Sequence, residues 1–266
     1  MPTPFYDAND GYPDYLLRND GNNNFTDITQ KSGLAKKRDR RTFSASLVDL
    51  NFDNHPDLVV VADFSGLDFY INDGKGNFTD KTEDFGDEKY AFGMSHTFGD
   101  WNSDGIQDLC LVGMSSTTAR RLDGLGIIKP GYEKYSMMRA PMTFGNRLYT
   151  RDTKGNFTQP KFTSSAARSG WSWGCTASDF DLDGDTDLYL ANDKTLNFLY
   201  LNDGRGQFEE MGLLAGTAYN EDGDVEAGMG VDMGDYDNDR YPDLFVTNFQ
   251  WETNTCLLYT SDAADE

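Results

Sequence analysis

Four short acidic segments of this 266-residue chain repeat one spacing of oxygen-bearing side chains. The clearest reads DFDLDGDTDL from Asp179 to Leu188, with aspartates at its first, third, fifth and ninth positions and Gly184 at the sixth. Four carboxylates in one loop repel one another unless a cation offsets their charge, and Ca²⁺ takes six to eight oxygen ligands from flexible loops. Glycine permits the tight turn that such a loop needs. The segment therefore predicts a calcium site.

Three further segments share this spacing, and each of the four runs directly into an apolar stretch that is typical of a strand. We expect the side chains at positions one, three, five and nine to ligate the ion, together with the main-chain carbonyl at position seven. The expected ligands are Asp49, Asn51, Asp53, His55 and Asp57 in the first loop, Asp100, Asn102, Asp104, Ile106 and Asp108 in the second, Asp179, Asp181, Asp183, Asp185 and Asp187 in the third, and Asp235, Asp237, Asp239, Tyr241 and Asp243 in the fourth. A worn fifth copy at Asp10–Asp14 matches only positions five, six and nine. An active site is rarely copied four times, so the repetition favours structural ions over catalysis.

Other metals fit these segments less well. Mg²⁺ demands a tighter octahedral geometry, and transition-metal sites would use His or Cys side chains. His55 occupies a seventh position, where its carbonyl and not its ring would bind, and His96 is expected to pack in a strand.

The composition indicates a folded and strongly acidic protein. Its 45 acidic and 23 basic residues give a net charge of −22, which argues against nucleic acid as a partner. A hydrophobic fraction of 38% is enough to build a core. No apolar run approaches the ~20 residues that span a membrane, and no signal peptide is visible at Met1–Phe5. Cys110, Cys175 and Cys256 lack the spacing of a metal site, and we expect the first two to be buried free thiols.

Two other repeated pieces define the unit in which each acidic loop lies. An Asn-Asp-Gly turn signal begins at Asn72 and recurs in varied form at Asn19, Arg151 and Asn202. A small and aromatic piece precedes each loop, as in Phe43–Ser46. The unit therefore reads as a four-stranded antiparallel meander, and meanders repeated at about 40–60 residues indicate a β-propeller. We predict an all-β fold with about four blades in an incomplete ring.

Two features leave alternatives open. The longest interval between loops points to an insertion near Ser115–Met142 that is basic against an acidic background; it is either a solvated loop over the propeller edge or a binding loop on one face. Trp101, Trp171 and Trp173 are expected to fill the core between blades, although they could instead stack on sugars.

The repeat extends through residues 1–255, and residues 256–266 do not follow it. Cys256–Glu266 reads CLLYTSDAADE, which is the translation of a widely used transposase sequencing adapter. We interpret these residues as non-native and expect the natural protein to continue with further blades.

The motifs resemble those of a known family. Asp179–Leu188 and the segment GMGVDMGDYDND at Gly228–Asp239 resemble the FG-GAP/VCBS repeats of integrin-α-type β-propellers. The segment GWSWG at Gly170–Gly174, followed by its acidic loop and by N-x-G-x-G-x-F, is closest to the cartilage-acidic-protein/ASPIC-like group of secreted proteins. The resemblance covers nearly all of residues 5–255. It implies Ca²⁺ in each intact loop, an extracellular, cell-surface or periplasmic setting, and adhesion or ligand binding without a shared catalytic residue set. The first and fourth loops depart from the family pattern because they lack the glycine at position six.

Two classes of function remain open. The first is a non-enzymatic, calcium-stabilised propeller that recognises a protein or glycan ligand. The second is a propeller-type enzyme that acts on polysaccharide, which would need a convergent acid/base pair outside the acidic loops. The sequence shows no nucleophile motif, glycine-rich phosphate loop or zinc-ligand cluster. We therefore expect no enzymatic activity.

Overall fold

The structure of the chain, a computed structural model, describes residues 4–258. Within them, three sheets have four strands, one has three and one has two. The four-stranded sheets are β3 (Arg41–Val48), β4 (Asp57–Asp63), β5 (Gly66–Asn72) and β6 (Phe78–Asp80); β7 (Gly93–Gly99), β8 (Asp108–Gly113), β9 (Arg147–Arg151) and β10 (Phe157–Thr158); and β11 (Ser172–Ser178), β12 (Asp187–Asn192), β13 (Phe198–Asn202) and β14 (Phe208–Glu210). The others are β15 (Gly228–Gly234), β16 (Asp243–Asn248) and β17 (Thr255–Leu257), and the hairpin of β1 (Leu17–Gly21) and β2 (Asn24–Asp27).

Each sheet is an antiparallel meander, so strands that are consecutive in the chain are neighbours in the sheet. The second strands carry the most apolar sequences, such as LVVVA in β4 and LCLV in β8, and those of the three four-stranded sheets are almost completely buried. A strand that is apolar on both faces is buried on both faces, because a neighbouring sheet lies against each. The predicted four-stranded unit is therefore confirmed.

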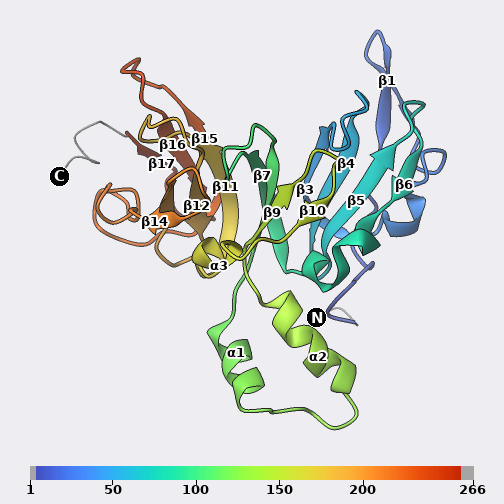
Figure 1. Cartoon of the computed structure of the whole chain (residues 1–266), viewed down its shortest axis with the longest axis horizontal. Coiled ribbons are helices and arrows are strands. Elements are labelled where there is room, and N and C mark those ends of the chain that lie inside the picture. Colours follow the sequence, from blue (N-terminus) through green and yellow to red (C-terminus); the bar gives the residue numbers. More distant parts are fainter. Residues whose placement is uncertain (1–3, 259–266) are drawn as a thin grey trace.

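The sheets are arranged as blades. Their first strands, β3, β7, β11 and β15, lie next to one another, and the remaining strands fan outward from them (Figure 1). Separate apolar clusters fill the spaces between successive sheets: one contains Val61 and Leu111, the next Val112 and Leu188, and the third Leu199 and Val246. This is an incomplete β-propeller, and the all-β fold class is confirmed.

Glycine lets two of the inner strands approach closely. A Cβ atom placed on Gly174 of β11 would lie 2.9 Å from the Cα atom of Gly230 in β15. Any larger residue would push these two strands apart. The small residues before each acidic loop therefore set how tightly the blades meet near the axis.

The two ends of the blades differ in what they carry. In an antiparallel meander, the connections from first to second strand and from third to fourth strand leave from the same end. The acidic loops and the Asn-Asp-Gly turns therefore share one end of the propeller. The connection from β8 to β9, which holds the insertion, leaves from the opposite end (Figure 1).

The insertion is helical, which corrects its reading as a loop. It forms α1 (Thr117–Gly124) and α2 (Glu133–Met142). The Ser116 side chain caps α1 by accepting the N–H of Ala119 at 3.2 Å. Three other short helices lie outside the sheets: η1 (Leu34–Lys37), η2 (Thr82–Lys89) and α3 (Thr163–Ala166). None of the helices in residues 4–258 is long and apolar enough to cross a membrane.

The expected core residues divide into two groups. Trp101 is completely buried, as predicted, but Trp171 is 53% exposed, so the prediction that all three tryptophans fill the core is wrong. Trp171 lies just before β11, and the strand register shifts between Ser172 and Gly174, so the two rings of GWSWG do not share one environment. Cys110 and Cys175 are buried free thiols, as expected.

The end of the described chain continues the last sheet. Cys256 and Leu257 lie in β17 and pair with β16. Residues 259–266 lie outside the described residues. The interpretation of residues 256–266 as non-native stays a prediction.

His96 is a buried contact between the first two blades. It lies in β7, as predicted, and its Nδ1 atom is 2.9 Å from the Ser44 hydroxyl of β3. Its Nε2 atom is buried without a hydrogen-bond partner among the described residues. Burial lowers the pKa of His96 to about 4, because charging the ring in this position costs desolvation energy.

Acid should therefore destabilise the protein through His96. The unfolded chain binds this proton near pH 6.5 and the folded chain only near pH 4, so the contribution of the neutral ring is complete above pH 6.5 and is lost as the pH falls toward 4. Between pH 7 and pH 4.5 the loss should be about 2–3 kcal/mol. Urea unfolding measures it: the variant His96→Gln should lose correspondingly less stability than wild type over this interval. Equal losses would contradict the assignment.

Candidate metal centres

The four acidic loops have one backbone conformation. Each joins the first strand of a blade to the second, and in each the carboxylate at position one accepts the N–H of position six. These distances are 2.8 Å at Asn54, 2.7 Å at Gly105, 3.0 Å at Gly184 and 3.2 Å at Arg240. The carboxylate at position five accepts the N–H of position seven, at 2.8–2.9 Å in every loop. The shared spacing in the sequence therefore produces a shared fold.

The loops hold their shape with strained backbone angles. Position six has positive φ in all four, including Asn54 at 66° and Arg240 at 82°, where the family pattern has glycine. Position four is also left-handed, with φ of 65° at Phe52 and 62° at Leu182. A non-glycine residue in this region costs roughly 1–2 kcal/mol. The two loops without glycine therefore make the turn, but with more strain.

The aspartate at position nine fastens the loop to its blade. Asp57, Asp108, Asp187 and Asp243 are buried. In the third loop, Asp187 accepts the N–H of Phe180 at 2.7 Å and, with its other oxygen, the N–H of Asn202 at 2.9 Å. The first and second loops repeat both bonds through Asp57 and Asp108. One carboxylate therefore ties the loop, the second strand and the third strand together.

Burial of these carboxylates has an electrostatic cost. Desolvation raises the pKa of both Asp108 and Asp187 to about 7, although their main-chain hydrogen bonds act in the opposite direction. The neighbouring loop carboxylates raise both pKa values further. A nearby cation would reverse this effect, because opposite charge favours the ionised form.

The third and fourth loops bring three carboxylates together. Oxygen atoms of Asp179, Asp181 and Asp187 lie within 4.8 Å of one another, as do those of Asp235, Asp237 and Asp239. In the third loop the Oδ1 atom of Asp179 is buried and has no hydrogen-bond partner among the described residues. A buried carboxylate oxygen without a partner is costly. The third loop therefore has oxygen ligands that suit a hard cation, and one of them has no other partner.

In the first and second loops, an asparagine side chain satisfies one of the carboxylates. Position three is asparagine, and its amide group donates to the position-five carboxylate at 3.0 Å, from Asn51 to Asp53 and from Asn102 to Asp104. This bond helps to lower the pKa of Asp53. The first two loops are thus less crowded with negative charge than the other two.

Several expected ligands have other contacts. The position-seven residues His55, Ile106, Asp185 and Tyr241 use their N–H groups inside the loop, and ligation by their carbonyls stays a prediction. Asp183 and Asp243 are outside the two carboxylate groups. Asp10 and Asp14, the worn fifth copy, bind Arg41 and Thr42 instead.

Side chains that the sequence analysis did not single out link the first and second loops to the next blade. Arg151 of β9 donates to the Asp49 carbonyl at 3.1 Å, and Asn202 of β13 donates to the Trp101 carbonyl at 3.0 Å. The Ser103 hydroxyl donates to the Asp185 carboxylate at 2.8 Å, from the second loop to the third. These contacts join sheets that are far apart in the chain, so no local pattern could reveal them.

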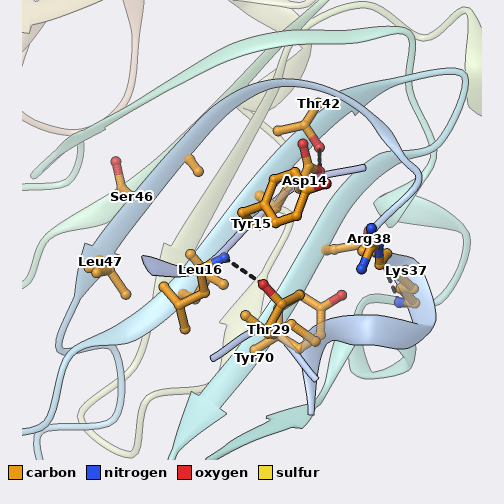
Figure 2. A pocket seen from close by; sticks show the side chains of 15 residues that line it. Asp14, Tyr15, Leu16, Thr29, Lys37, Arg38, Thr42, Ser46, Leu47 and Tyr70 are labelled. Carbon is orange, nitrogen blue, oxygen red and sulfur yellow. Dashed lines mark hydrogen bonds and ion pairs between the residues drawn. The ribbon is translucent and has the colours of Figure 1, made fainter. Parts of the chain in front are cut away.

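A separate cavity of about 410 Å³ lies beside the first blade. Figure 2 shows it between the segment around Tyr15 and the β3–β5 face of the sheet, with Leu47 and Tyr70 on its wall. Several of its charged groups already have partners: Lys37 binds Asp68 at 2.7 Å, and Asp14 accepts from Thr42 at 2.6 Å. The cavity is therefore a weaker candidate than the loops.

Removing one acceptor oxygen from Asp187 should destabilise the third blade. In Asp187→Asn, one of the two main-chain N–H groups faces an amide NH₂, which should cost about 2–4 kcal/mol. Urea unfolding in calcium-free buffer measures this cost apart from any effect on ion binding. Asp222→Asn is the control, because Asp222 is exposed and its carboxylate makes no hydrogen bond within residues 4–258. A loss for Asp187→Asn no larger than for the control would contradict the role of position nine.

Comparison with known proteins gives a family relationship for part of the chain. A model of the FG-GAP-like repeat matches residues 49–111 and 179–246, which contain the first, second, third and fourth loops. No curated protein matches the sequence. The fold is similar to that of an Agrocybe aegerita lectin that recognises non-reducing terminal N-acetylglucosamine, with a TM-score of 0.49 and 16% identity over 96% of this chain and 59% of the lectin. It is also similar to the Photorhabdus luminescens Tc holotoxin pore, with a TM-score of 0.38 and 14% identity over 83% of this chain and 9% of that one. The chain therefore spans less than two thirds of either structure. The loops that hold the carboxylates are thus parts of FG-GAP-like repeats.

Proposed function

We propose that this chain is a non-enzymatic, calcium-stabilised propeller that recognises a protein or glycan ligand outside the cell, at its surface or in the periplasm. The observation that carries the proposal is the third loop, where three carboxylates converge and a buried oxygen of Asp179 has no partner among the described residues. The acidic loops recur in the FG-GAP-like repeats, and this repetition supports a structural role for the proposed ions.

Calcium suits the donor set better than other ions. The loops offer carboxylate, amide and carbonyl oxygens, which hard cations prefer. Ca²⁺ tolerates irregular loops, whereas Mg²⁺ needs near-octahedral geometry. Asp179, Asp181 and Asp187 would hold the ion in the third loop, and Asp235, Asp237 and Asp239 in the fourth. Bound there, the ion would offset the repulsion between carboxylates.

The loops should differ in affinity. The third has four aspartates and Gly184, and it carries less backbone strain than the fourth, where Arg240 takes the left-handed turn. The first and second loops have one carboxylate fewer. Their asparagine side chains also donate a hydrogen bond to the position-five carboxylate, and this bond must break before the asparagine oxygen can reach an ion. We therefore expect the third loop to bind most tightly and to lose its ion last.

Recognition would use the ends of the propeller and the insertion. The first strands of the blades are rich in small residues that pack near the axis, and the carboxylates are used within the loops, so neither is expected to contact the ligand. Loss of the ions would loosen the links from Arg151, Asn202 and Ser103 between blades. We therefore propose that ligand binding depends on calcium indirectly, through the shape of the ring.

Binding and turnover separate the proposal from a polysaccharide-cleaving enzyme. The full chain should bind a subset of a glycan or protein array in millimolar Ca²⁺, and binding should fall at least about tenfold in excess EDTA or in Asp181→Ala. Incubation with the polysaccharides that bind should release no new reducing ends. Asp222→Ala is the matched control and should bind as wild type does. Release of reducing ends, or binding unaffected by EDTA, would contradict the proposal.

A further inference from the structure

The insertion ends in a convex tip of exposed aliphatic side chains. The tip, residues 125–132, links α1 to α2 and lies at the far end of the insertion from the sheets (Figure 1). Leu125 is 63% exposed, Ile127 49% and Ile128 58%, and Tyr132 lies beside them. Apolar side chains gathered on a protruding surface mark an interaction site. Nothing in the blade repeat requires them.

The tip is held in position by contacts on both sides. Met138 and Met142 of α2 are buried against Tyr6, in a cluster that docks the insertion on the N-terminal segment. Arg139 donates to the Asp123 carboxylate at 2.9 Å and to the Ile127 carbonyl at 3.1 Å, so it joins α2 both to α1 and to the tip. The aliphatic side chains are therefore presented outward by a packed element.

Four exposed cations lie on the insertion together with the exposed carboxylate of Glu133, and Lys134 lies 5.2 Å from the centre of the Tyr6 ring. Arg120, Arg121, Lys129 and Lys134 are exposed, and none forms an ion pair with a carboxylate of residues 4–258. Asp123 is occupied by Arg139. Lys129 lies 4.2 Å from the centre of the Tyr132 ring, at the edge of the tip. The insertion is therefore a local positive patch on a chain whose net charge is −22.

The acidic loops lie at the other end of the propeller. The β8–β9 connection that carries the insertion leaves from the end opposite to the β7–β8 loop (Figure 1). Trp171 and Trp251, which are 53% and 93% exposed, lie next to strand ends on the insertion side. An anionic surface that meets the insertion would thus face cations and apolar groups and stay far from the carboxylate loops.

We propose that the tip inserts into the surface of an anionic lipid bilayer. Leu125, Ile127 and Ile128 would enter the boundary between headgroups and acyl chains, and the four cations would lie among lipid phosphates and carboxylates. A convex aliphatic tip suits a deformable apolar phase, whereas glycans are bound in concave polar and aromatic sites. Basic residues are attracted to an anionic surface, so the patch steers the approach and sets the orientation.

Vesicle flotation with the full chain tests the proposal. The chain should float with vesicles that contain phosphatidylserine and phosphatidylcholine, and not with phosphatidylcholine alone. The triple variant Leu125→Ser/Ile127→Ser/Ile128→Ser should reduce the bound fraction at least about tenfold. Arg120→Gln/Lys129→Gln should weaken partitioning about tenfold or more and make it less sensitive to salt.

Matched variants at the opposite end keep the test specific. Lys75→Gln/Lys154→Gln removes two exposed turn cations, and Phe25→Ser/Leu47→Ser removes two apolar side chains that are 59% and 56% exposed. Both should bind as wild type does, and circular dichroism should show that every variant is folded. Three outcomes would overturn the proposal: no flotation of wild type, equal loss in the matched variants, or a change of oligomeric state in the tip variant, which would assign the tip to a protein interface.

Discussion

The structure of each blade depends on one buried carboxylate at the end of its acidic loop. Asp187 shows the arrangement most clearly, since its two oxygens accept main-chain N–H groups from the loop and from the third strand. A buried carboxylate must be fully hydrogen-bonded, so its position fixes the groups around it. The spacing between positions one and nine then places the other oxygens of the loop. The blade and its candidate metal centre are therefore one unit.

This constraint explains why the loops contain more negative charge than the protein alone can balance. With position nine committed to the main chain, Asp179 and Asp181 must share the remaining space. The first loop relieves its crowding through the Asn51 amide, but an aspartate has no proton to donate. Because Arg151 and Asn202 connect loops to neighbouring blades, a cation bound in one loop, as we propose, would also support the contact between two sheets.

Charge also distinguishes the two ends of the propeller. Carboxylates gather where first and second strands meet, and the insertion at the other end carries four exposed cations without an ion pair among residues 4–258. Because the two ends differ in charge, a charged surface would orient the protein with one end toward it. Adhesive recognition and attachment to a bilayer are then compatible, because the bilayer would contact the tip of the insertion and leave the end with the acidic loops free for a ligand.

Local spacing predicted the strands, the loops and the blade repeat, because side-chain periodicity and turn residues follow from backbone geometry close in the chain. It did not predict the left-handed backbone at Leu182 and Phe52, since neither residue favours turns and the loop imposes the angle. The helices of the insertion were missed because each is short, and the exposure of Trp171 was missed because it depends on which strand face a neighbouring sheet covers. The links made by Arg151 depend on contacts between sheets and could not be read from one segment.

Thermal unfolding with and without calcium tests the central claim most directly. At ten times its dissociation constant, Ca²⁺ would add about 1.4 kcal/mol per site, so four sites would add about 6 kcal/mol, comparable with the net stability of a domain. For a chain of this size the melting temperature should fall by more than about 10 °C when EDTA replaces Ca²⁺. Asp181→Ala should show a smaller difference because one site is lost. An identical melting temperature in Ca²⁺ and in EDTA would contradict the account.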